Sequence, residues 1–416
     1  MRKKISEKLK FKILAFYMLV IIGFALLNSP LSEIIIGLKK IIFSTDILIS
    51  DYIEIGGLGA AFINSGLLGL IALLFIRIEK TKLNGLSIAA IFTIAGFSLF
   101  GKNSINVIPI ILGVWLYSFY QKEKFNNYII PALFGTTLAP MVSQIAYMFD
   151  FSIIGISLGI LLGLIIGFII SPIASHVIVA HEGFNLYNLG FTAGIIGTII
   201  ISVFRTFGLD FQAHLIWSTK FTKTIFVFLV IYFTSMILIG YILSSKNNLG
   251  IKNLKILWQR SGRVVTDFII QDGFSLTLIN MGVMGLLYTM LIILIDAPLN
   301  GPVVGGIFTI VGFSAFGKHP FNTGPIVIGV LLGALTNTWT LQNPTFILAL
   351  LFSTTLAPIA GFFGSISGII AGFLHLTVVS NLTYLHGGLN LYNNGFSGGF
   401  VATFLYPLLD GLKKER

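Results

Sequence analysis

Long, almost uninterrupted apolar stretches run through this chain, separated by short polar segments. About 20 consecutive apolar residues can cross a bilayer as an α-helix. In the first half, the pattern predicts an interfacial stretch at 30–50 and spans at 12–28, 52–76, 85–100, 104–120, 128–148, 152–179 and 184–204. In the second half, it predicts an interfacial stretch at 249–266 and spans at 224–244, 268–295, 301–316, 322–340, 345–358, 360–381 and 385–408. The segments 85–100 and 301–316 are short and rich in glycine, which is typical of re-entrant or broken helices.

The two halves contain the same phrases in the same order. Residues 84–116 and 300–332 share 18 of 33 positions at an offset of 216. TTLAP occurs at 136–140 and again at 354–358, and NLYN occurs at 185–188 and again at 390–393. Internal repeats of this kind underlie many transporter folds. We therefore predict two membrane repeats, residues 1–210 and 211–416, of about seven helical elements each.

The basic residues predict that the second repeat lies upside down relative to the first. An odd number of elements per repeat requires this, and cytoplasmic loops carry an excess of Lys and Arg. With a cytoplasmic N-terminus, 19 of the 26 basic residues fall on the cytoplasmic side and five on the outer side. The predicted fold is an all-α polytopic membrane protein of two inverted-topology repeats, with short re-entrant or broken helices and both termini in the cytoplasm.

The composition excludes a soluble globular domain. Hydrophobic residues make up 56% of the 416 and charged residues 10%, against about 25% charged in soluble domains. The net charge of +11 is spread over short loops, so we expect the lipid bilayer as partner and no nucleic acid. The basic start and residues 13–27 resemble a signal peptide, but no cleavage site follows, so we interpret them as a retained span. The chain has no cysteine, which rules out disulfides and thiol chemistry.

Two lysines lie inside apolar sequence at equivalent positions. Lys102 and Lys318 each follow the phrase GFSxFG. A buried ammonium costs about 2.5–3.5 kcal/mol at a helix centre. These side chains are therefore candidates for an electropositive constriction or for direct binding of an anionic group. Alternatively, each closes the C-terminal end of a half-helix and meets its carbonyls.

The NLYN strings place amides and a phenol at the start of a predicted span. Such groups need hydrogen-bond partners within a membrane. We interpret them as ligands for a small polar solute, with helix capping as the alternative. The residues are Asn185, Tyr187, Asn188, Asn390, Tyr392 and Asn393.

The TTLAP strings place threonines just before a proline. Because proline leaves a carbonyl unpaired within a helix, the hydroxyls can satisfy freed backbone groups of a broken helix. The alternative is that unwound carbonyls here bind the solute or an ion. The threonines are Thr136, Thr137, Thr354 and Thr355.

Histidines and acidic residues add candidates for proton transfer. His319 follows Lys318, and His181 and His386 precede the NLYN strings as repeat mates. Histidine titrates near neutrality, so each is a candidate proton relay or an ordinary polar contact. Glu54, Glu182 and Asp272 each occur in only one repeat, which makes them candidates for ion or proton coupling.

Enzyme patterns fail on their context. GFSLFGK and GFSAFGK match part of a P-loop, but Asn103 and His319 stand where Ser or Thr would bind magnesium. GxSxG occurs only inside apolar spans, and no metal-ligand spacing appears. We therefore predict no cofactor, no metal and no catalytic activity.

The strings GFSxFGK, TTLAP and NLYNxGF together resemble an uncharacterised bacterial family of multispan membrane proteins. That resemblance implies a bacterial inner-membrane location and no particular substrate. IFTIAGFSLFGKNS with GFNLYNLGFTAGIIG, and their second copies, are also similar to the repeated phrases of urea transporters. This similarity implies inverted repeats around a narrow path. The present chain departs from it by carrying lysine in each copy.

These observations predict a transporter or channel-like facilitator for a small polar or anionic solute. The path would run between the repeats, and a homo-oligomer is compatible with this architecture. An anion-selective channel is the alternative, because broken helices and basic residues serve channels equally well. An intramembrane enzyme is a weaker alternative. It would need a nucleophile or an acid–base pair within the membrane, and the sequence offers little besides His181 next to Glu182.

Overall fold

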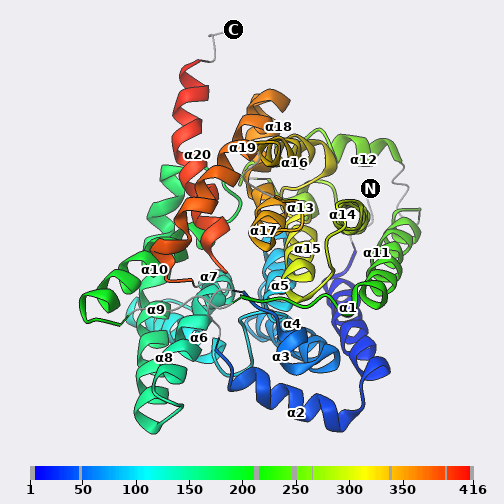
Figure 1. The fold of residues 1–416 in the computed structure, drawn as a ribbon. Coiled ribbons are helices and arrows are strands. Elements are labelled where there is room, and N and C mark those ends of the chain that lie inside the picture. The colour runs from blue at the N-terminus through cyan, green and yellow to red at the C-terminus, as the bar shows by residue number, and fades with distance from the viewer. Residues whose placement is uncertain are drawn as a thin grey trace.

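The computed structural model describes residues 5–45, 49–209, 215–245, 251–264, 266–336, 340–388 and 391–412. Nearly all regular structure in these ranges is helical (Figure 1), and nine of the helical segments found there are long and apolar enough to cross a membrane. The predicted all-α membrane architecture is thereby confirmed. One small feature was not predicted, a parallel pair of two-residue strands, β1 (Ile49–Ser50) and β2 (Leu215–Ile216).

The helices of the two repeats follow the same order. The first repeat contains α1 (Glu7–Asn28), α2 (Leu31–Ile42), α3 (Tyr52–Gly56), α4 (Leu58–Ile78), α5 (Gly85–Phe97), α6 (Val107–Tyr120), α7 (Ile129–Gly135), α8 (Ala139–Met148), α9 (Ile153–Ala180) and α10 (Asn188–Thr206). The second contains α11 (Thr222–Ser245), α12 (Ile251–Leu257), α13 (Phe268–Gln271), α14 (Phe274–Leu294), α15 (Gly301–Phe313), α16 (Pro320–Ala334), α17 (Pro344–Phe352), α18 (Ala357–Phe363), α19 (Ser365–Leu382) and α20 (Asn393–Gly411).

The repeats pack alike internally and meet through equivalent helices. α1 packs on α4 as α11 packs on α14, and α6 packs on α9 as α16 packs on α19. Helix α5 also packs directly against its own equivalent, α15, near the centre of Figure 1. These shared pairings identify two copies of one helical unit.

Helices α5 and α15 run in opposite directions. A Cβ on Gly85, at the start of α5, would lie 2.3 Å from the carbonyl oxygen of Ala315, beyond the end of α15. A Cβ on Gly96, near the end of α5, would lie 2.7 Å from the carbonyl oxygen of Gly305. Equivalent helices that pack antiparallel are related by a two-fold axis perpendicular to them. The predicted inverted topology is therefore confirmed.

A second pair of equivalents crosses at the same interface. α10 packs on α20, and a Cβ on Gly395 would lie 2.7 Å from the Cα of Gly190. These two glycines are repeat mates. The absence of side chains lets the two backbones touch where the repeats meet.

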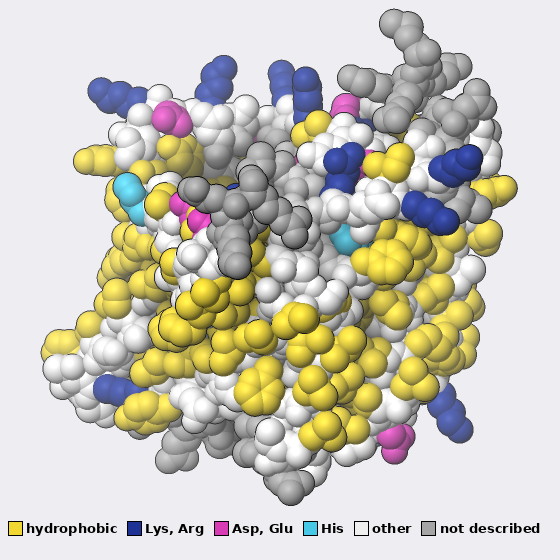
Figure 2. All heavy atoms as spheres, turned by 90° about the horizontal axis from the view of Figure 1, so that it is seen from above, with side chains coloured by type: hydrophobic (Ala, Val, Ile, Leu, Met, Phe, Trp, Pro, Cys, Tyr) yellow, Lys and Arg dark blue, Asp and Glu magenta, His cyan; other side chains and the backbone are white. Residues whose placement is uncertain are grey.

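The surface carries the pattern expected in a bilayer. Figure 2 shows a broad hydrophobic band on the face in view, with Lys and Arg gathered mainly along one edge. Large apolar side chains such as Ile153 and Leu27 are 85% and 88% exposed. An apolar surface of this extent is unfavourable in water and favourable against lipid.

Several predicted boundaries were wrong for local reasons. The span at 52–76 is divided into α3 and α4 by Gly57, whose φ of 86° interrupts the helix, and Gly273 divides α13 from α14 in the same way. The segment predicted to begin at 184 instead begins with irregular backbone, and α10 follows. The segment predicted to begin at 385 begins within a 3₁₀ turn (Thr383–His386), and α20 begins only at Asn393. Helix α18 continues to Phe363, so α19 begins later than predicted. Part of 322–340 lies outside the described residues.

Candidate functional site

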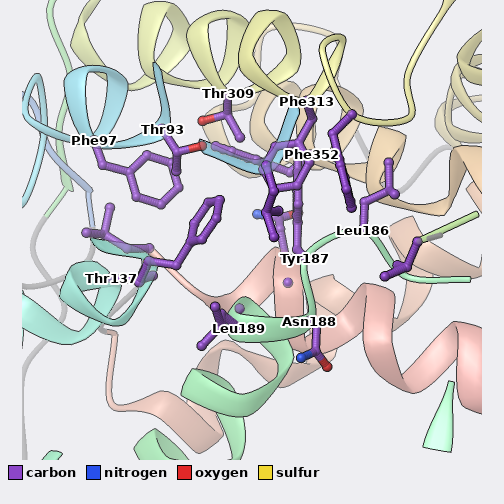
Figure 3. Close-up of a pocket in the computed structure, with 18 of the residues that line it drawn as sticks. Thr93, Phe97, Thr137, Leu186, Tyr187, Asn188, Leu189, Thr309, Phe313 and Phe352 are labelled. Atoms are coloured by element: carbon purple, nitrogen blue, oxygen red, sulfur yellow. The ribbon is translucent and has the colours of Figure 1, made fainter. Parts of the chain in front are cut away.

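A cavity of about 130 Å³ lies where the two repeats meet. Its walls include repeat mates from both halves, such as Phe97 with Phe313 and Thr93 with Thr309. Figure 3 shows Phe97 and Thr137 on one side of the cavity and Phe313 and Phe352 on the other. The volume accommodates several water molecules or one small solute.

Most of the cavity wall is apolar, with a few polar groups. Phenylalanine and leucine side chains predominate among the lining residues. The polar lining side chains are Thr93, Thr137, Tyr187, Asn188, Thr309 and Asn394. Small-molecule sites commonly have this character, because the apolar wall excludes water and a few polar groups orient the ligand. None of these lining side chains is charged.

Lys102 and Lys318 lie behind this wall. Both side chains are fully buried, and neither takes part in the ion pairs found among the described residues. The Nζ of Lys102 is 5.0 Å from the centroid of the Phe97 ring, and the Nζ of Lys318 is 5.3 Å from that of Phe313. Because the rings line the cavity, each ammonium is one side chain away from it.

Threonines of the TTLAP strings bind the lysines. Lys102 Nζ donates to Thr136 Oγ1 at 2.9 Å, and Lys318 Nζ donates to Thr354 Oγ1 at 2.7 Å. Both hydroxyls in turn donate to carbonyls three residues earlier, within 3₁₀ turns that interrupt the helix. The hydroxyls thus bond backbone carbonyls of the broken helix, as the first interpretation of TTLAP expected, and they also accept from the lysines, which was not predicted. Of the four threonines, only Thr137 lines the cavity.

The first NLYN string links the repeats. Tyr187 accepts from Lys318 Nζ through its hydroxyl at 2.5 Å and lines the cavity. The Asn185 side chain donates to the Gly395 carbonyl at 3.4 Å and does not line the cavity. Thr355 Oγ1 donates to Asn185 Oδ1 at 2.5 Å. These bonds hold the segment before α10 against the second repeat.

The other asparagines of these strings meet histidines. His181 is 2.9 Å from Asn188 Oδ1, and its mate His386 is hydrogen-bonded to Asn393. In this matched pairing the amides bond histidines, and among the described residues neither α10 nor α20 has a side-chain cap at its N-terminus. Asn188 also lines the cavity. Asn390 lies outside the described residues.

His319 and the unmatched acidic residues lie away from the cavity. The His319 ring is 2.8 Å from the Arg260 carbonyl oxygen through Nε2 and does not line the cavity. The acidic candidates are in ion pairs, Glu54 with Lys220, Glu182 with Arg263 and Asp272 with Arg260. The hydrogen bond from Lys220 lowers the pKa of Glu54, and the hydrogen bond to Asp272 raises the pKa of Arg260.

Two asparagines that sequence reasoning missed hold the lysine turns. Asn64 Nδ2 donates to the carbonyls of Ser98 and Lys102, both at 2.7 Å. Its mate Asn280 makes the same two bonds in the second repeat, both at 2.8 Å. The offset of 216 that relates the lysines also relates these asparagines, so the repeat spacing could have found them.

Two missed aspartates join the repeats. Asp51 accepts from the backbone N–H of Gly301, at the start of α15, and its mate Asp267 accepts from that of Gly85, at the start of α5. Each carboxylate also caps its own short helix, α3 or α13. A carboxylate at a helix N-terminus is favourable because it meets unpaired N–H groups and the helix dipole. Each aspartate thus also binds the start of the short helix of the other repeat, which holds α5 and α15 in place.

The fold and cavity define a multi-pass α-helical membrane protein built from two inverted repeats. The chain belongs to the family described as Protein of unknown function (DUF1576), whose model matches residues 31–206 and 246–411. One matched segment falls in each repeat, and the predicted membership in an uncharacterised family is confirmed. No curated protein and no solved structure matches the chain.

Proposed function

We propose that this protein is a transporter, or a channel-like facilitator, for a small polar or anionic solute. Its path would run through the cavity between the two repeats. One observation carries the proposal: repeat mates from both halves line a cavity flanked by two buried lysines. Intramembrane lysines are costly and usually face a functional path or a partner.

The inverted repeats add independent support. In secondary transporters, solute sites form where inverted repeats meet, next to broken helices. The TTLAP turns and the short helices α5 and α15 provide such breaks beside this cavity. We place the protein in a bacterial inner membrane, as the family resemblance implies. We place both termini in the cytoplasm, as the distribution of basic residues predicts.

Uptake into proteoliposomes tests the proposal. Radiolabelled acetate, benzoate, phosphate and urea would be presented separately to liposomes that contain the full chain. We expect at least one to enter faster than into empty liposomes, and the double variant Lys102→Met/Lys318→Met to reduce that rate at least about tenfold. Lys39→Met/Lys40→Met is the matched control, because these lysines are exposed on α2. Unchanged uptake in the folded Lys102→Met/Lys318→Met variant contradicts the proposal.

Planar-bilayer recording separates the two forms of transport. A carrier gives no single-channel current, whereas an anion channel gives unitary currents whose reversal potential follows the anion gradient. Unitary currents would assign the protein to the channel form.

A further inference from the structure

The two lysines are equivalent in sequence but differ in their hydrogen bonds. Lys318 Nζ donates to two oxygens, the Tyr187 hydroxyl and Thr354 Oγ1. Among the described residues, Lys102 Nζ donates to Thr136 Oγ1 alone. An ammonium carries three donors. Lys102 therefore has two donors without a partner in the described part of the chain, in a fully buried position.

The tyrosines show the matching difference. Tyr187 reaches Lys318 from the cavity wall. Its mate Tyr392 is also buried, but its hydroxyl has no hydrogen-bond partner among the described residues and points toward Gly197. Buried hydroxyls without a partner are rare in native proteins and call for an explanation.

The threonines next to the lysine ligands differ in the same sense. The backbone N–H groups of Leu186 and Tyr187 donate to the carbonyl and hydroxyl oxygens of Thr355. In the first repeat, the mate Thr137 donates within its own helix to the Phe134 carbonyl, and its side chain lines the cavity. The segment before α10 thus covers Thr355, on the Lys318 side. Thr137, on the Lys102 side, instead lines the cavity.

We infer that Lys102 is a subsite for the carboxylate of a small organic acid, which takes the place that the Tyr187 hydroxyl occupies at Lys318. This inference rests on the proposed function and specifies its substrate class. At Lys318, the phenol demonstrates that an oxygen acceptor introduced from the cavity wall reaches the ammonium. A carboxylate is a better acceptor than a phenol, because both partners are then charged. The phenylalanine walls suit an apolar body attached to that carboxylate.

The repeat symmetry implies a second conformation in which these contacts are exchanged between the repeats. In that conformation, the Tyr392 hydroxyl binds Lys102, and Tyr187 leaves Lys318. A substrate carboxylate at Lys102 occupies the position that the Tyr392 hydroxyl takes in the second conformation. The substrate therefore favours the first conformation, in which Tyr187 binds Lys318. Exchange between two such arrangements exposes the subsites alternately, and a ligand shifts the populations by its preference for one of them.

Ligand binding tests the subsite without requiring flux. Sodium benzoate, with sodium chloride at equal ionic strength as control, would be added to the purified full chain, and the apparent melting temperature measured. A ligand of the folded state raises it by mass action. We expect benzoate to raise the melting temperature of the wild type and of Lys318→Met, and not that of Lys102→Met. An equal rise in Lys102→Met, or none in the wild type, overturns the inference and leaves the flux test of the proposed function standing.

Thiol labelling tests the exchange. The chain lacks cysteine, so Thr355→Cys provides one thiol beneath the segment before α10. We expect Tyr187→Phe to raise its rate of reaction with a small maleimide about tenfold, because a charge-assisted hydrogen bond that favours the covered state is lost. Tyr392→Phe is the matched control and should not raise the rate, while benzoate should slow it. Equal rates in the two tyrosine variants overturn the exchange.

Discussion

Replacing Lys102 or Lys318 with methionine should change the stability of the protein by different amounts. The side chains are similar in length, so the main change is the loss of an ammonium and its hydrogen bonds. Burying an ammonium costs several kcal/mol even after the surroundings relax. Lys102 recovers part of this through one hydrogen bond and one ring contact, worth about 1.5–3 and about 2 kcal/mol at most. The free energy of unfolding of Lys102→Met should therefore be no more than about 2 kcal/mol below that of the wild type.

Lys318→Met should be less favourable. Lys318 makes two hydrogen bonds, and its removal leaves the buried Tyr187 hydroxyl without that partner. A buried polar group left unsatisfied costs about 1–3 kcal/mol. We therefore expect Lys318→Met to be less stable than Lys102→Met by about that amount.

The assay is thermal unfolding of both purified variants in one detergent. Size-exclusion chromatography checks that each elutes as the wild type does. The expected order places Lys318→Met below Lys102→Met in apparent melting temperature. Equal melting temperatures, or a Lys102→Met variant that is the less stable, would refute the unequal bonding of the two lysines.

Three further predictions concern the scaffold. Asn280→Leu should destabilise by about 3–5 kcal/mol, because it removes two bonds to buried carbonyls; thermal unfolding measures this, and a change below 1 kcal/mol would contradict it. Gly96→Ala should destabilise by about 1–3 kcal/mol, since its Cβ would lie 2.7 Å from the Gly305 carbonyl oxygen, whereas Gly23→Ala, whose Cβ meets no atom within 4 Å, should be neutral or stabilising. Burial raises the pKa of Asp51 from 3.8 to about 6, so the folded state binds this proton more tightly and stability should fall as pH rises from about 4 to about 6, by at most about 3 kcal/mol. Asp51→Asn should remove that part of the pH dependence, and identical pH profiles would argue against it.

Part of the site could be predicted because the repeat marks it: of the predicted site residues, Tyr187, Asn188 and Thr137 line the cavity. The shared phrases identified the lysines, the TTLAP threonines and the NLYN segment before α10. The same spacing also relates Asn64 to Asn280, which was overlooked because single asparagines inside apolar runs carry no local pattern. Their role depends on a turn 34 residues further along the chain.

The sequence by itself determined the membrane class, the duplication and the inverted topology. These follow from span length, from repeated phrases and from the sidedness of basic residues, which are properties of the chain read in order. It also marked the short Gly-rich segments 85–100 and 301–316, but it did not indicate that they meet between the repeats.

Only the tertiary structure decided which equivalent groups are bonded and which are not. The two lysines look alike in sequence, yet Lys318 holds Tyr187 and Lys102 faces Phe97 without an equivalent phenol. A sequence repeat specifies equal chemistry in both halves. An asymmetric arrangement of two equal halves arises because packing selects one set of long-range contacts, and that selection can be seen only when the chain is folded.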